Sequence, residues 1–303
     1  RTLNGRLVHK RLHSHALGIA KPFFVYEPPD LTHHKPLPVL YLFRGHEREW
    51  VNLREDRSRR KSTAIEDLDR MIVSGLIPPL LVVMPGLNSS NNWIPSLGID
   101  MVGRWQSKFR GLGSGQFWTY FTEELLPAID RRYPATTAGP KLMAGFSLGG
   151  YTVSLLAAKL PGFFSHAAIY DGTLMWPEHR DPRFGRQKNN DRIWCRSPLF
   201  DAALGKPRNR KAMRTWNSTS MILHADAAML HKLQKTKFWV ASAARDGGFG
   251  NRDRAQAFVK MLKRHSIRTG FRNIIFDPAA EHTWHWTDRF LATFLLKATA
   301  HLK

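Results

Sequence analysis

The sequence predicts an α/β fold in which a mainly parallel central sheet is covered by helices on both faces. Two observations lead to this class. Apolar segments with strand character alternate with helical segments along the 303 residues, at the spacing of β-α-β units. In addition, the apolar segment at 141–146 runs into the motif G-F-S-L-G at 145–149 and then into a helix that begins with small residues. A strand, a sharp turn that presents a serine, and a helix form a nucleophile elbow, which is a feature of parallel α/β sheets.

The remaining elements follow in chain order. After an N-terminal hairpin region, we expect strands at 37–45, 79–85, 141–146, 164–170, 236–244 and 272–277. We expect helices near 62–74, at 117–133, after the elbow serine, at 255–262 and after the last strand. The stretch 171–233 is irregular, with prolines scattered among basic and tryptophan residues. Because long loops in compact domains are usually functional, we interpret it as a cap or lid inserted beside the site of a single domain that spans 1–303.

The serine at the centre of the elbow, Ser147, is the candidate nucleophile. Gly145 and Gly149 frame it, because a Cβ at either position would press against the neighbouring strand or helix. A serine hydroxyl becomes a good nucleophile when a histidine takes its proton and a carboxylate orients that histidine. The alternative interpretation is a tight turn with an incidental serine, and the strand before and helix after Ser147 favour the catalytic one.

Both partners occur downstream in the order serine, acid, histidine. Asp246 follows the strand expected at 236–244, at the carboxyl end where function gathers in open α/β sheets. His282 is the first histidine after the last expected strand, whereas His285 falls inside the following helix. We therefore predict Asp246 as the acid and His282 as the base. Weaker candidates for the acid are Asp253, Asp277 and Glu281.

These motifs and several others resemble the putative-esterase (esterase D) family of the α/β-hydrolases, nearly from end to end. The segments at 14–18 and 24–29 are similar to the family's paired N-terminal strands, and P-V-L-Y-L-F-R-G-H at 38–46 resembles its strand and oxyanion loop. The segment at 117–130 is similar to the helix before the elbow, and H-T-W at 282–284 to the family's His-x-Trp. Feruloyl esterases, enterochelin esterases, S-formylglutathione hydrolases and mycobacterial mycolyltransferases belong to this family. One departure is Arg44, which stands where the family has histidine or aspartate before the glycine.

The resemblance implies an α/β-hydrolase fold and a serine carboxylic-ester hydrolase that needs neither a metal nor a cofactor. Ser147 would form an acyl-enzyme, which water then hydrolyses. We predict that the oxyanion is bound by the backbone N–H groups of Leu148 and His46. Aromatic side chains near the site are candidates for a substrate pocket: Trp50, Trp93, Phe146 and Trp284.

The sequence is also compatible with other functions. An acyltransferase would use the same triad with an alcohol in place of water, and product analysis with sugar or glycerol acceptors would separate the two. A non-enzymatic binding protein on a hydrolase scaffold usually lacks a triad member, whereas this sequence offers all three in order. Peptidase activity is compatible with the elbow but is disfavoured by the family resemblance.

Composition sets the outer bounds on partners and compartment. With 46 Lys and Arg against 24 Asp and Glu, the net charge is +22 and the isoelectric point about 10.6. Basic residues cluster at 54–61 and at 206–214, and neither cluster lies on a recognisable nucleic-acid module. We therefore expect the charge to attract an anionic ester or polymer, not a dedicated nucleic-acid partner. No apolar run of 18 residues predicts a membrane span, and no histidine spacing predicts a metal site. The single cysteine, Cys195, leaves both a cytoplasmic and a secreted protein open, and the oligomeric state is not indicated.

Overall fold

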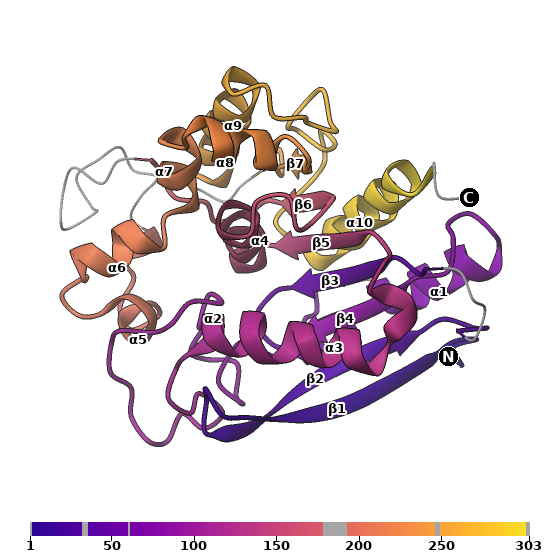
Figure 1. Cartoon of the computed structure of the whole chain (residues 1–303), viewed down its shortest axis with the longest axis horizontal. Coiled ribbons are helices and arrows are strands. Elements are labelled where there is room, and N and C mark those ends of the chain that lie inside the picture. The colour runs from indigo at the N-terminus through magenta and orange to yellow at the C-terminus, as the bar shows by residue number, and fades with distance from the viewer. Residues whose placement is uncertain (1, 32–35, 60, 178–192, 246–248, 301–303) are drawn as a thin grey trace.

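A seven-stranded sheet runs through the centre of the molecule (Figure 1). The structure is a computed structural model and describes residues 2–31, 36–59, 61–177, 193–245 and 249–300. The strand order is β1-β2-β4-β3-β5-β6-β7. The first two pairings, β1 with β2 and β2 with β4, are antiparallel, and the other four are parallel. The predicted α/β class with a mainly parallel sheet is therefore confirmed.

The strands are β1 (Arg6–Ser14), β2 (Ile19–Glu27), β3 (Val39–Phe43), β4 (Leu81–Pro85), β5 (Lys141–Phe146), β6 (His166–Tyr170) and β7 (Lys237–Ala241). The α-helices are α1 (Ala64–Val73), α2 (Phe117–Thr119), α3 (Leu126–Arg132), α4 (Leu148–Lys159), α5 (Asp201–Leu204), α6 (Arg210–Thr215), α7 (Ser218–Leu223), α8 (Ala227–Leu233), α9 (Asn251–Arg264) and α10 (Trp284–Ala298). Three further helical segments are η1 (Glu47–Trp50), η2 (Tyr120–Leu125) and η3 (Pro134–Thr136).

Apolar side chains on both faces of the central strands form two apolar cores, one on each face of the sheet. Successive side chains of a strand point to opposite faces. On β3, Tyr41 packs into the core beneath α3, α4 and α9, whereas Leu40 and Leu42 pack into the core beneath α1 and α10. All three side chains are fully buried, which explains why this strand reads as a continuous apolar run.

Most expected elements are present with shifted ends, and two differ. The helix expected at 117–133 consists of α2, η2 and α3 in direct succession, so its middle is more widely wound than an α-helix. The last expected strand, 272–277, is not a strand. Its backbone makes an isolated bridge between Ser242 and Ile275, and the loop that carries His282 still follows it. In the stretch 171–233, the described residues form α5 to α8.

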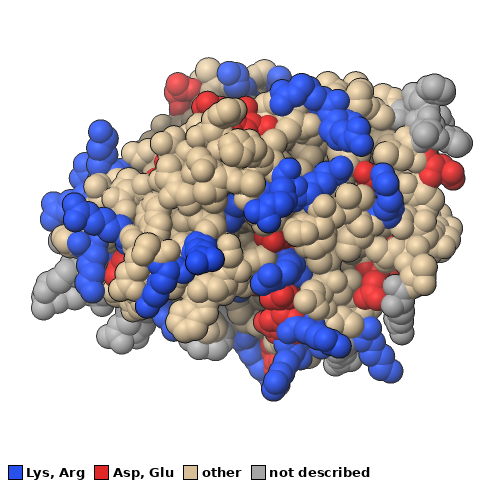
Figure 2. Space-filling model, turned by 90° about the horizontal axis from the view of Figure 1, so that it is seen from below, with Lys and Arg blue, Asp and Glu red and all other residues tan. Residues whose placement is uncertain are grey.

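Basic side chains are dispersed over the face of the molecule seen from below (Figure 2). Lys and Arg occur at several places on this face, and the fewer Asp and Glu side chains lie among them. On this face the basic side chains are spread out and do not gather into a single stripe.

The turn between β5 and α4 depends on very close backbone contacts. Ser147 has a φ of 55° and a ψ of −117°, a conformation that L-residues rarely adopt. A Cβ at Gly149 would lie 1.8 Å from the carbonyl oxygen of Phe43, and one at Gly145 would lie 2.2 Å from the carbonyl oxygen of Gly149. The start of α4 therefore rests directly on the carboxyl ends of β3 and β5, which fixes where the serine stands.

The substitution Gly149→Ala should destabilise the fold strongly, because its methyl group meets backbone atoms that cannot move aside. We expect a loss of more than about 4 kcal/mol in the free energy of unfolding, measured by urea denaturation, or failure to fold. Gly75→Ala is the control: Gly75 has a φ of 70°, and no heavy atom lies within 4 Å of the place where its Cβ would stand, so only the backbone cost of about 1 kcal/mol applies. Equal losses in the two variants would contradict the close contact at the elbow.

Candidate functional site

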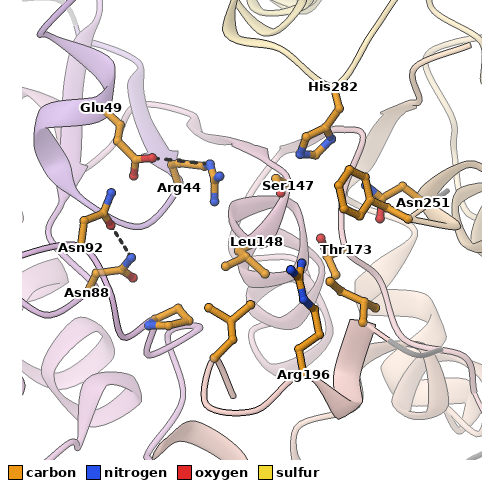
Figure 3. Close-up of a pocket in the computed structure, with 14 residues that line it drawn as sticks. Arg44, Glu49, Asn88, Asn92, Ser147, Leu148, Thr173, Arg196, Asn251 and His282 are labelled. Carbon is orange, nitrogen blue, oxygen red and sulfur yellow. Dashed lines mark hydrogen bonds and ion pairs between the residues drawn. The ribbon is translucent and has the colours of Figure 1, made fainter. Parts of the chain in front are cut away.

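Ser147 lies at the floor of a pocket, at the first point where the chain leaves β5 (Figure 3). The residue is 7 % exposed. Its backbone is held on both sides: its N–H donates to the carbonyl of Tyr170 at 3.2 Å, and its carbonyl accepts from the N–H of Thr173 at 2.9 Å. The backbone of the turn is therefore fixed, and it presents the Ser147 hydroxyl to the pocket. His282 lines the same pocket and lies above the serine in Figure 3.

The imidazole of His282 is oriented by a buried carboxylate. Nδ1 of His282 lies 2.5 Å from Oδ2 of Asp171, the residue that directly follows β6. The ring also packs on Phe146, with 4.6 Å between the ring centroids. With Nδ1 engaged by the carboxylate, Nε2 is left to face the pocket, which is the arrangement a general base requires. No hydrogen bond joins the hydroxyl of Ser147 to the imidazole in the described residues, and such contacts commonly tighten only when substrate binds.

Asp171 is fully buried and held by four donors. Oδ1 accepts from the hydroxyl of Ser242 at 2.6 Å and from the N–H of Ala243 at 3.0 Å, while Oδ2 also accepts from Asn251 Nδ2 at 3.1 Å. Burial alone would raise the pKa of Asp171, but the hydrogen bonds from His282, Ser242 and Asn251, together with the charge of the imidazolium, outweigh it and lower the pKa below its usual value. The carboxylate is therefore ionised at neutral pH.

The acid predicted from the sequence, Asp246, lies outside the described residues. Of the weaker candidates, Asp253 is exposed on α9, and Glu281 pairs with Arg245 at 3.4 Å instead of reaching the base. Asp277 accepts from the N–H of Ala279. The signal that could have found Asp171 was present in the sequence, because this residue also follows a predicted strand directly.

The two predicted oxyanion donors differ in their availability. Leu148 is the first residue of α4, and its N–H has no acceptor among the described residues, as expected for an orphan donor at a helix start. The N–H of His46 instead donates to Oε2 of Glu49 at 2.7 Å, and the N–H of Gly45 donates to the same oxygen at 3.1 Å. A carboxylate side chain therefore occupies the position that an oxyanion at His46 would take in this structure.

The pocket has a volume of about 270 Å³ and is lined by both polar and apolar side chains. Its walls are formed by Arg44, Glu49, Asn88, Asn92, Pro95, Ser147, Leu148, Thr173, Ile193, Arg196, Leu199, Phe249, Asn251 and His282. The aromatic residues expected to line it do not. Trp50 and Trp284 are fully buried and pack edge to face with 4.8 Å between centroids, Trp93 is 72 % exposed, and Phe146 lies beneath His282. Trp50, Phe146 and Trp284 thus support the site from the core.

Two further expectations concern metals and membranes. Among the residues that the structure describes, no group of three or more His, Cys, Asp or Glu side chains is arranged to hold a metal ion. None of the helices in the described part of the chain has the length and apolar character needed to cross a bilayer. His285 lies inside α10, as expected, and packs against Trp286.

Comparisons with known proteins agree with this architecture. The family model described as "Putative esterase" matches residues 14–294. Among solved structures, a ferulic acid esterase is similar with a TM-score of 0.70 at 19 % identity, over 100 % of both chains. An S-formylglutathione hydrolase from Agrobacterium tumefaciens has a TM-score of 0.65 at 21 % identity, over 100 % of this chain and 95 % of the other. An enterobactin esterase from Shigella flexneri has a TM-score of 0.59 at 14 % identity, over 100 % of this chain and 61 % of the other.

The buried histidine beside Glu49 should make the fold sensitive to acid. Burial, followed by the charges of Arg48 and Lys21, lowers the pKa of His46 from 6.5 to about 4. Because the unfolded chain binds this proton more readily, the stabilising effect of a neutral His46 is complete above pH 6.5 and is lost as the pH falls toward 4. The free energy of unfolding of the wild type should therefore fall between pH 7 and pH 5. We expect this fall to be smaller by about 1–2 kcal/mol in His46→Gln. The exposed His231, changed to Gln, should leave that fall unaltered, and the same effect in both variants would refute the assignment.

Proposed function

The chain belongs to the putative esterase family, and from this premise we propose that it hydrolyses carboxylic esters through an acyl-enzyme on Ser147. In this proposal His282 is the general base and Asp171 is the carboxylate that orients it. The observation that supports it best is the 2.5 Å contact between His282 Nδ1 and Asp171 Oδ2, beside a serine held in a strained elbow. Carboxylic ester hydrolysis itself follows from the family.

The reaction proceeds in two halves. His282 Nε2 removes the proton of the Ser147 hydroxyl as Oγ attacks the ester carbonyl, and the imidazolium then donates that proton to the departing alcohol. Water enters, loses a proton to His282, and attacks the acyl-enzyme, so that the acid leaves and Ser147 is regenerated. Asp171 holds the productive tautomer and stabilises the imidazolium without taking a proton itself.

The oxyanion of each tetrahedral intermediate needs preorganised donors. The N–H of Leu148, at the start of α4, is our first predicted donor, and the positive end of the helix dipole would add to its effect. The N–H of His46 stays our predicted second donor, and its use requires Glu49 Oε2 to withdraw from it. Loss of one such donor typically reduces transition-state stabilisation by about 3–4 kcal/mol.

We also propose that the stretch 171–233 acts as a cap over the site within one domain. Ile193, Arg196 and Leu199 come from this stretch and line the pocket next to Ser147. The cap has its own small apolar core, in which Trp194 packs against Tyr151 of α4 with 5.2 Å between ring centroids. The pocket wall is thereby tied to the helix that carries the elbow.

The nucleophile can be tested by covalent labelling. An organophosphonate should attach to one residue, and mass spectrometry of the digested protein should locate it on the peptide that contains Ser147. Ser154, which is buried on α4 and hydrogen-bonded to Ser218, serves as an internal comparison on the same helix. An adduct on another residue in an active sample would require a different nucleophile.

The acid can be tested by comparing two isosteric variants. We expect Asp171→Asn to lower kcat by about 10⁴, because the amide would stabilise the wrong tautomer of His282, while Asp246→Asn changes kcat little. Circular dichroism and urea denaturation check that each variant is folded. A large loss of kcat in Asp246→Asn would show that Asp246 is the catalytic acid, whatever the stability of Asp171→Asn.

A further inference from the structure

The charged side chains around Ser147 form an unbalanced set. Among the described residues that line the pocket, Arg44 and Arg196 carry positive charges, and Glu49 carries a negative one. Two guanidinium groups therefore face one carboxylate on the described pocket wall, and the further carboxylate of the site, Asp171, is fully buried and already engaged by its own hydrogen-bond donors. In Figure 3 the guanidinium groups of Arg44 and Arg196 extend from different walls toward the space around Ser147.

Arg44 is held in position but lacks a full set of hydrogen-bond acceptors. Its guanidinium lies 5.2 Å from the centre of the Phe146 ring, and its side chain is only 21 % exposed. Its Nε forms an ion pair with Glu49 Oε1 at 3.7 Å, beyond hydrogen-bond distance, and is buried without a hydrogen-bond partner in the described residues. The other oxygen of Glu49 already accepts two backbone N–H groups. A buried donor in this condition is costly unless a ligand supplies an acceptor.

Arg196 reaches the pocket from the cap. It is exposed, and no carboxylate of the described residues lies within ion-pair distance of its guanidinium. The neighbouring Arg208 illustrates the contrast, because it forms an ion pair with Asp201 at 2.7 Å. A guanidinium without a counterion on a pocket wall is suited to bind a carboxylate or phosphate of a ligand.

We propose that the substrate is a small ester that also carries a carboxylate, which Arg196 and Arg44 bind while Ser147 attacks the ester. A carboxylate offers two oxygens that accept hydrogen bonds from guanidinium groups, whereas a phosphate dianion would bring a second negative charge close to Glu49. The pocket volume of about 270 Å³ agrees with a small substrate. This inference rests on the hydrolytic function proposed above and adds the chemical class of the substrate.

The test compares anionic esters with their neutral methyl esters. On the alcohol side, 4-acetoxybenzoate is paired with methyl 4-acetoxybenzoate; on the acyl side, mono-4-nitrophenyl glutarate is paired with its methyl ester. The readout is the ratio of kcat/KM for the anionic over the neutral ester. We expect a ratio well above one in one of the two pairs, and that pair identifies the side on which the carboxylate is bound.

Variants then assign the preference to the arginines. Arg196→Met should lower the ratio about tenfold or more, the effect of removing a charge-assisted hydrogen bond. Arg44→Met should lower it as well, and if that variant does not fold, Arg196→Met alone decides. Arg272→Met is the matched control, because it removes the same charge from an exposed site beside α9. The ratio is also measured in about 0.5 M NaCl, where electrostatic interactions are screened beyond roughly 4 Å. A preference that persists there comes from direct contact with the arginines, whereas one that disappears comes from long-range attraction by the net charge of +22.

The outcomes distinguish the two proposals. If all four esters are hydrolysed with ratios near or below one, or if Arg272→Met lowers the ratio as much as Arg196→Met does, the carboxylate subsite is refuted while the hydrolytic function stands. If Ser147→Ala hydrolyses the neutral esters as fast as the wild type, the proposed hydrolytic site itself is refuted.

Discussion

The site depends on one steric constraint, the contact of the first turn of α4 with the ends of β3 and β5. Gly149 can lie against the carbonyl of Phe43 only because it has no side chain, and this contact holds Ser147 at a φ of 55°. If α4 moved outward by the size of a methyl group, the serine would leave the pocket floor and the amide of Leu148 would point elsewhere. The strain at Ser147 is maintained by the two apolar cores, which fix the sheet and helix on either side of it.

Asp171 links the elements that surround this turn. Its carboxylate joins the end of β6 to Ser242 and Ala243 after β7, to Asn251 at the start of α9, and to the loop of His282. A buried charge requires such a complete set of donors, since an unpaired carboxylate would be protonated or excluded. The same hydrogen bonds that stabilise the ionised form therefore assemble the segments that form the site.

Much of this architecture could be predicted from local patterns. The glycine-framed serine, the buried strands and the position of His282 after the last apolar segment each depend on neighbours in the chain. The contacts of the acid do not: both Asp171 and Asp246 follow a predicted strand, and only the three-dimensional arrangement brings Asp171 to His282. Likewise, the sequence indicates neither that Glu49 bonds to the amide of His46 nor that Trp50 and Trp284 pack against each other instead of lining the pocket. The segment at 272–277 has strand composition but makes only an isolated bridge, because pairing is decided by the sheet edge available to it.

The most direct test of the account is a proton NMR spectrum of the resting enzyme in the far-downfield region. A short hydrogen bond between His282 Nδ1–H and a buried carboxylate should give a resonance there, well separated from the backbone amides. We expect this resonance in the wild type and in Asp246→Asn, and its loss in folded Asp171→Asn and His282→Gln. A resonance that persists in Asp171→Asn and disappears in Asp246→Asn would contradict the central claim that Asp171 orients the catalytic histidine.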